Sequence, residues 1–368
     1  MLRRGAIAFG VLAAVATALT GTTDANAVSP PRPGTACQST LATALAHGAR
    51  YVGCITDSTV IRSRALAADA SPQAAAKCTK GYLTYNRTTA CAVATQALTV
   101  YDVETGDEVG GMNFTTSERG TDAVKGGRTW KHSISITPSR VWGAAVRESA
   151  SIQMQCGRAA KSACQVTAHP KTQVLSLGHT SSFPFSLKSP GKNALTHRET
   201  PLITLEAPET TPASGELPQL ATVRCDSASY LGSTTGGCVN PGSVPVFRMS
   251  RTDALVKQAA EHIWSAQRTL KGHPGLQGSG KPLHRTTNAK TIDKNRSRAC
   301  PSSLHRPAGD SCDEYPFAST KEGGASGVFS RKMINAKQNS RAGNVYLNVN
   351  FCKTNRVLDG DAFWVAIS

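Results

Sequence analysis

Regular alternation of hydrophobic and polar side chains marks the middle of the chain. The segments LTVYDVETGDEVGG (98–111), RTWKHSISITPS (128–139) and SIQMQCG (151–157) alternate in this way, and turn residues interrupt or follow them. A period of two is typical of strands that bury one face. Several short strands at this spacing predict a mainly β module over residues 97–218, similar to a β-sandwich.

Two stretches beside this region differ from it. Residues 28–96 are rich in alanine and carry four cysteines, with Leu41 and Leu45 at loose helical spacing. They predict a small, partly helical segment stapled by disulfides. Residues 205–221, LEAPETTPASGELPQLA, are rich in Pro, Glu, Thr and Ser. This composition predicts a linker or a long loop.

The last part of the chain mixes helical and strand patterns. Residues 253–270, DALVKQAAEHIWSAQRTL, place apolar side chains at helical spacing, and Ser250 and Thr252 are the candidate caps. Short strands are predicted at PVF (245–247), at GVFSRKMI (327–334) and at DAFWVAI (361–367). Residues 344–351 fit a helix or a strand, and both interpretations stay open. The predicted fold class is α+β.

The N-terminus has the pattern of an export signal. Two arginines precede an apolar run over about residues 5–19, and the sequence ANA at 25–27 offers a small-residue cleavage site. This arrangement predicts a secretory signal peptide over residues 1–27. The sequence shows no later run of about 18 apolar residues. We therefore expect a secreted, extracellular protein without a membrane partner.

Cysteine spacing agrees with export. Ten of the 11 cysteines have a close cysteine neighbour in sequence, and local disulfides are the natural interpretation in an oxidising environment. Sequence alone does not fix the connectivity. A zinc site is the alternative, which the lack of C-x-x-C spacing disfavours. The expected pairs are Cys37–Cys54, Cys78–Cys91, Cys156–Cys164, Cys225–Cys238 and Cys300–Cys312, with Cys352 unpaired.

The chain is basic, and its C-terminal part contributes strongly to this. The formal net charge is +17, and residues 251–368 hold 18 Lys and Arg against 9 Asp and Glu. Such a balance favours a polyanionic partner, either nucleic acid, an anionic wall polymer or a membrane surface.

An acidic stretch, SCDEYPFASTKEGG (311–324), stands out within this basic part. Asp313, Glu314 and Glu322 would repel one another if they converged, so a fold that gathers them needs a cation between them. Mg²⁺ or Mn²⁺ is the usual choice, because hard cations take carboxylate oxygens and keep water positions that a phosphate can occupy. The alternative is an acidic turn on the solvated surface.

Phosphodiester hydrolysis needs a metal that polarises the phosphoryl oxygen, a base that activates water, and cations that hold the backbone. His305 is a second candidate for the base. The candidate phosphate-binding residues near the acidic stretch are Lys321, Arg331, Lys332, Lys337 and Arg341.

The acidic stretch, followed by FSRKMINAKQN (329–339) and RVLDGDAFWV (356–365), resembles the NucA/NucB family of secreted bacterial deoxyribonucleases. The resemblance covers about residues 222–368. It implies a deoxyribonuclease domain similar to the ββα-metal nucleases, preceded by the β module and the small cysteine-stapled segment.

The resemblance also implies residue roles. Asp313 would be the base that activates water, and Glu314 or Glu322 would orient water or metal. Asn348 would be the metal ligand on a helix, with Asn339 second. We therefore expect a secreted endonuclease that uses Mg²⁺ or Mn²⁺ to hydrolyse DNA with little sequence specificity. The alternative is a catalytically inactive basic protein that binds DNA, or an anionic cell-wall polymer through its N-terminal region.

Overall fold

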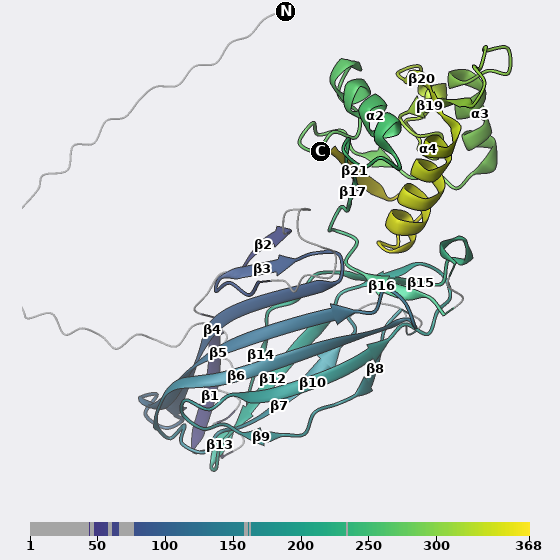
Figure 1. Cartoon of the computed structure of the whole chain (residues 1–368). Coiled ribbons are helices and arrows are strands. Elements are labelled where there is room, and N and C mark those ends of the chain that lie inside the picture. The colour runs from purple at the N-terminus through teal and green to yellow at the C-terminus, as the bar shows by residue number, and fades with distance from the viewer. Residues whose placement is uncertain are drawn as a thin grey trace, which may run out of the picture.

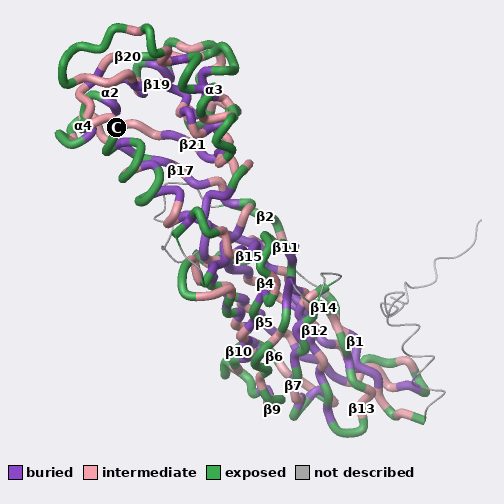
Figure 2. Tube along the Cα trace, turned by 90° about the vertical axis from the view of Figure 1, so that its right-hand side faces the viewer, coloured by how far each residue is buried: buried purple, intermediate pink, exposed green. Residues whose placement is uncertain are grey.

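A computed structural model describes residues 44, 48–57, 61–65, 77–157, 161, 163–232 and 235–368. The predicted signal peptide, residues 1–27, lies outside this described part. Two units follow each other along the chain (Figure 1): a strand-rich unit that ends with β16, here the β module, and a unit of helices and short strands from β17 onward, here the C-terminal module. Buried residues run through the interior of both units (Figure 2).

Two antiparallel-rich sheets form most of the β module. The main order of the larger sheet is β13 (Thr210–Thr211), β1 (Tyr51–Asp57), β4 (Thr89–Asp102), β5 (Glu108–Asp122), β6 (Thr129–Gly143), β10 (Ser181–Lys188) and β8 (Gln165–Ala168). In the same sheet, β3 (Tyr82–Tyr85) also pairs with β4, and β2 (Arg62–Ala65) pairs with β3. The smaller sheet has the order β14 (Ala213–Glu216), β12 (Thr200–Glu206), β7 (Ser149–Gln155) and β9 (Gln173–Val174).

The two sheets enclose one hydrophobic core. Leu98, Phe114 and Ile134 of the larger sheet and Ile152 and Ile203 of the smaller sheet are buried in the same cluster. Burial alternates residue by residue along β4 and β7, because successive side chains of a strand point to opposite faces. The strands predicted over 98–111, 128–139 and 151–157 are therefore confirmed.

Two predicted domain borders do not follow the sheets. The border between residues 96 and 97 lies within β4, and residues 51–96 contribute β1 to β3 and half of β4 to the larger sheet, where partial helix was predicted. Residues 223–239, predicted to belong to the C-terminal domain, contain β15 (Val223–Asp226) and β16 (Gly237–Val239). β15 pairs with β11 (Leu195–His197) on one side and with β16 on the other, and the three strands form a third sheet of the β module.

The interpretation of residues 205–221 as a linker or a long loop is wrong. This stretch completes β12 and supplies β13 and β14, and Leu217 and Leu220 are buried. Its few leucines anchor an otherwise polar segment to the β module, which composition alone does not reveal.

The C-terminal module combines a small sheet, a hairpin and helices. β17 (Val246–Met249) runs parallel to β21 (Ala362–Ile367), and β18 (Leu283–His284) pairs with β21 on its other side. β19 (Asp310–Tyr315) and β20 (Ser330–Asn335) form an antiparallel pair. Its helical elements are α2 (Lys257–Thr269), α3 (Ala289–Ala299), α4 (Ala336–Arg341), the π-helical η3 (Ala342–Lys353) and the single turn η2 (Gly324–Ser326). The β module has the single turn η1 (Ser229–Leu231) between β15 and β16.

The open question about residues 344–351 is resolved as helix, since they lie within η3 directly after α4. β19, β20 and α4 follow one another along the chain, while the likeness to ββα-metal nucleases stays a prediction. The α+β class is in agreement with this mixture. No helix among the described residues is long and apolar enough to cross a membrane.

Helix α2 buries the apolar side chains whose helical spacing predicted it. Ala259, Ile263 and Ala266 are buried in a core that also holds Phe247 and Phe363. The helix begins later than expected, at Lys257, without a side-chain cap. The predicted caps Ser250 and Thr252 instead bond each other in the preceding turn.

Disulfides follow the predicted neighbours. Four of the five expected bridges are present: Cys78–Cys91, Cys156–Cys164, Cys225–Cys238 and Cys300–Cys312. The fifth expected pair includes Cys37, which lies outside the described residues. Cys352 is a free, buried thiol, as predicted.

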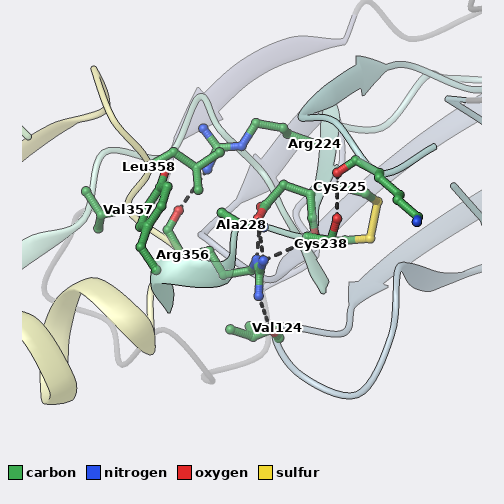
Figure 3. A network of polar contacts seen from close by, with 12 residues as sticks. Val124, Arg224, Cys225, Ala228, Cys238, Arg356, Val357 and Leu358 are labelled. Carbon is green, nitrogen blue, oxygen red and sulfur yellow. Dashed lines mark hydrogen bonds and ion pairs between the residues drawn. A yellow bond between two sulfur atoms is a disulfide. The ribbon is translucent and has the colours of Figure 1, made fainter. Parts of the chain in front are cut away.

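Buried arginine side chains join the two modules. Arg356 of the C-terminal module is 1% exposed, and its guanidinium donates to Asp226 Oδ2 at 3.0 Å and to the carbonyl oxygen of Val124 at 3.0 Å (Figure 3). Both acceptors belong to the β module. Arg356 itself has a positive φ of 44°, a conformation that few non-glycine residues adopt, so the local backbone is held by these contacts.

Two arginines of the β module reach in the opposite direction. Arg224 Nη1 donates to Asp361 Oδ1 at 2.6 Å, and Arg87 Nη2 lies 3.2 Å from Asp361 Oδ2. Both arginines also donate to the carbonyl oxygen of Arg356. Burial and the neighbouring Arg224 lower the pKa of Arg87 to about 10. The charges at the junction are therefore buried, paired and shared between the modules.

Candidate active site

The acidic motif opens onto a hollow of the C-terminal module. This cavity has a volume of about 820 Å³. Residues from β19, α3, α4 and η3 form its wall, together with Tyr230 of η1. Asp313 and Glu314 both line it, as do Asn339 and Asn348.

Glu314 is the acid that the strand presents to the cavity. Along β19, Asp313 and Tyr315 are buried at 7% and 0% exposure, whereas Glu314 between them is half-buried on the other face of the strand. Burial raises the pKa of the Glu314 carboxyl to about 7, the nearby Asp313 adds to this rise, and Arg296 opposes it. A carboxyl that titrates near neutral pH can exchange protons with substrate or water.

Asp313, which also lines the cavity, is in contact with a buried histidine. His262 Nδ1 lies 2.7 Å from Asp313 Oδ2, and His262 Nε2 lies 2.9 Å from Ser330 Oγ. Sequence reasoning missed His262. The available signal was its position on α2, three residues after Ala259 and one before Ile263, which places a histidine in the buried apolar stripe.

Glu322 does not join the other two acids. Its Oε1 lies 2.7 Å from His284 Nδ1, and its Oε2 accepts from the His284 backbone N–H at 2.8 Å. Among the described residues that line the cavity, Glu322 is absent. The three acids predicted to share one cation therefore separate into a pair, Asp313 and Glu314, and a carboxylate that ties its loop to β18.

The cations that line the cavity differ from the predicted ones. Arg285, Arg296 and Arg306 contribute to its wall. The predicted residues, all within the described part of the chain, are exposed and lie outside this lining: Lys321, Arg331, Lys332, Lys337 and Arg341. The alternative base, His305, is likewise exposed and outside it.

Two of the predicted cations flank the acids across the hairpin. In the register of β19 and β20, Arg331 stands opposite Glu314 and Lys332 opposite Asp313. Arg331 Nη1 also donates to the carbonyl oxygen of Ala299. These exposed charges are placed beside the cavity, where the flanking backbone of a polyanion would run.

Asn339 and Asn348 offer amide oxygens in the cavity. Asn339 Nδ2 donates to Ser311 Oγ at 3.0 Å and to the carbonyl oxygen of Cys312 at 3.1 Å, which orients its amide group. Asn348 Oδ1 accepts only a long contact of 3.5 Å from Arg285 Nη2. Both residues project from the helix that follows the hairpin.

These donors fit a hard divalent cation in part. One desolvated carboxylate and amide oxygens suit Mg²⁺ or Mn²⁺, which keeps several waters and binds substrate phosphate. Within the described residues, no group of three or more His, Cys, Asp or Glu is arranged to hold a metal ion. A cation here would therefore depend on Glu314, the two asparagines, water and phosphate, and a thiolate–imidazole site is not formed by these residues.

Comparison with known proteins finds a family match for the C-terminal part of the chain. A glycosyl hydrolase family 2 member from Bacteroides cellulosilyticus matches over 34% of this chain and 23% of its own length, with 9% identity and a TM-score of 0.13, a likeness too low to support an argument. No curated protein matches the sequence. The sequence model of the family Deoxyribonuclease NucA/NucB matches residues 271–366. This range contains Glu314, Asn339 and Asn348, and the C-terminal part of the chain therefore carries the NucA/NucB deoxyribonuclease match that its acidic motif predicted.

Proposed function

We propose that the protein is a secreted, divalent-cation-dependent endonuclease that hydrolyses phosphodiester bonds of DNA with little sequence specificity. The observation that carries this proposal is the cavity in which Glu314, with a pKa of about 7, meets amide oxygens and three arginines. All of these residues lie within the range matched by the deoxyribonuclease family.

Glu314 is the group that handles the proton. A general base works best when its pKa lies near the operating pH, and burial brings this carboxyl to about 7. Glu314 in its ionised form accepts a proton from the attacking water. Asp313 was the predicted base, but its hydrogen bond to buried His262 favours a positioning role between β19 and α2.

Asn339, Asn348 and a Glu314 oxygen are the groups that would hold Mg²⁺ or Mn²⁺. Such a cation supplies Lewis-acid polarisation of the phosphoryl oxygen when it is bound. The positive charge would also favour the ionised form of Glu314, against the burial that raises its pKa. Glu322, bonded twice to His284, fixes the loop after the acidic motif.

Arginines hold the substrate backbone. Arg285, Arg296 and Arg306 line the cavity. The guanidinium groups of Arg285 and Arg306 already donate to backbone carbonyl oxygens, so Arg296 is the arginine of this wall best suited to bind phosphate oxygens. The exposed Lys321, Arg331, Lys332 and Arg341 would meet phosphates further along the strand. Contacts to phosphate position the nucleic acid without reading bases, which supports low sequence specificity.

Four disulfides in the described residues support function outside the cytoplasm. The signal-peptide pattern of residues 1–27 supports the same conclusion.

The test is degradation of plasmid DNA by the oxidised mature protein with Mg²⁺ or Mn²⁺, with and without a chelator. We expect cleavage that the chelator stops, and loss of cleavage in Glu314→Gln. Glu104→Gln, which removes an exposed carboxylate in a turn of the β module, is the matched control and should cleave normally. DNA binding without cleavage in either metal would favour the inactive DNA-binding alternative, and retention on an anionic wall polymer without DNA binding would favour the wall-binding one.

A further inference from the structure

One aromatic side chain from outside the matched family range reaches the cavity. Tyr230 belongs to η1, between β15 and β16 of the β module, 41 residues before the family match begins. It lines the same cavity as Glu314 and Asn348, and it is 42% exposed. A large aromatic side chain left this accessible beside a polar cavity is available for contact with a ligand.

Contacts on several sides hold Tyr230 in place. Its hydroxyl accepts from the backbone N–H of Asp359 at 3.2 Å, and the Arg285 guanidinium carbon lies 5.3 Å from its ring centroid. The next residue, Leu231, is buried. Upstream, Asp226 accepts from the N–H of Ala228 and binds Arg356 of the C-terminal module (Figure 3). The ring is therefore pre-positioned at the junction of the two modules.

We propose that Tyr230 is a stacking platform for a base of the DNA next to the scissile phosphate, an assignment that rests on the proposed nuclease function. Every base presents a flat π-face, so stacking on an aromatic ring contributes affinity without sequence preference. This agrees with a cavity whose other contacts are to phosphate. A base that stacks on the ring must first unstack from the adjacent bases of its strand. Tyr230 therefore favours single-stranded or locally opened DNA over a closed duplex.

The experiment compares Tyr230→Ala, Tyr230→Phe and Tyr230→Trp with the wild type in the full chain. Binding of a fluorescent single-stranded oligonucleotide is measured in chelator, and cleavage of the same oligonucleotide is measured with Mg²⁺ or Mn²⁺. Loss of one stacked base corresponds to roughly 5- to 150-fold weaker binding. We expect Tyr230→Ala to weaken binding and raise KM within this range, with a smaller effect on duplex DNA, whereas Tyr230→Phe keeps the ring and stays near the wild type. In Tyr230→Trp, the added indole emission should be quenched when the oligonucleotide binds.

The two proposals fail in different ways. A wild-type protein that binds the oligonucleotide but never cleaves it contradicts the nuclease function, while the binding and quenching measurements still decide the role of Tyr230. Unchanged binding in Tyr230→Ala overturns the stacking assignment. Equal losses in Tyr230→Ala and Tyr230→Phe also overturn it, because they would place the effect in the hydroxyl contact to Asp359 and not in the ring.

Discussion

Removing one partner of the ion pair between Arg356 and Asp226 should cost more stability than removing one partner of an exposed pair. In Arg356→Met, the side chain keeps much of its length but loses its charge. The carboxylate of Asp226, 1% exposed, then remains buried without its guanidinium, and the carbonyl oxygen of Val124 loses its donor. Arg356→Met therefore removes a contact that joins the two modules.

The expected loss in the free energy of unfolding follows from the burial of the pair. Removing one partner of a buried ion pair typically costs about 3–5 kcal/mol, because the remaining charge cannot be solvated. An exposed pair contributes only about 0–1 kcal/mol. The pair Arg50–Glu209, whose side chains are 66% and 64% exposed, supplies the matched control Arg50→Met within the same chain.

Urea unfolding, followed by intrinsic fluorescence and by far-UV circular dichroism, measures the difference. We expect Arg356→Met to lower the free energy of unfolding by about 3–5 kcal/mol and Arg50→Met by less than about 1 kcal/mol. Arg356→Met combined with Asp226→Leu should recover much of the loss, since no unpaired charge remains buried. A free energy for Arg356→Met equal to that of Arg50→Met would refute the reasoning.

Two further predictions concern pH and covalent bracing. Glu148 is 2% exposed, and burial, with a smaller effect of Glu206, raises its pKa from 4.5 to about 7. The folded state therefore holds a proton that the unfolded state releases, so this contribution to stability is complete below about pH 4.5 and lost as the pH rises through about 7. Glu148→Gln should gain stability relative to the wild type between pH 5 and pH 8 by up to roughly 3 kcal/mol, and an unfolding difference that does not change with pH would contradict this. The Cys300–Cys312 bridge closes a loop with a sequence separation of 12, so replacing both cysteines by alanine should cost about 3 kcal/mol in urea unfolding under oxidising conditions. An unchanged unfolding midpoint would contradict this expectation.

Local sequence patterns were enough to predict most of the secondary structure. Strands β4 to β7 were predictable because one face of each is buried, which writes a period of two into the sequence. The four disulfides were predictable because each joins cysteines 8 to 13 residues apart. The stretch 205–221 was not, because its burial depends on Leu217 and Leu220 fitting between strands that are distant in sequence.

The sequence predicted the part of the candidate site that lies in one continuous segment, but not the residues that other elements bring to it. Asp313 and Glu314 stand in a recognisable motif, and alternation within β19 then separates their side chains. Arg285, Arg296 and Tyr230 reach the cavity from other elements. Their places depend on how α3, η1 and the loop after β18 pack, which no local pattern records.

The cavity also depends on contacts that cross the junction of the modules. Arg224 and Arg87 of the β module outweigh the effect of burial and hold the pKa of Asp361 below its ordinary value, so this carboxylate stays ionised within the junction. The backbone beside it is bonded to Arg285, which accepts from Gly360 N–H and donates to the Asp361 carbonyl. Arg285 in turn contacts Asn348 and lies over the ring of Tyr230. A continuous series of polar contacts therefore links the arginines of the β module to Arg285, Asn348 and Tyr230, so this side of the cavity wall is set by more of the chain than the family match covers.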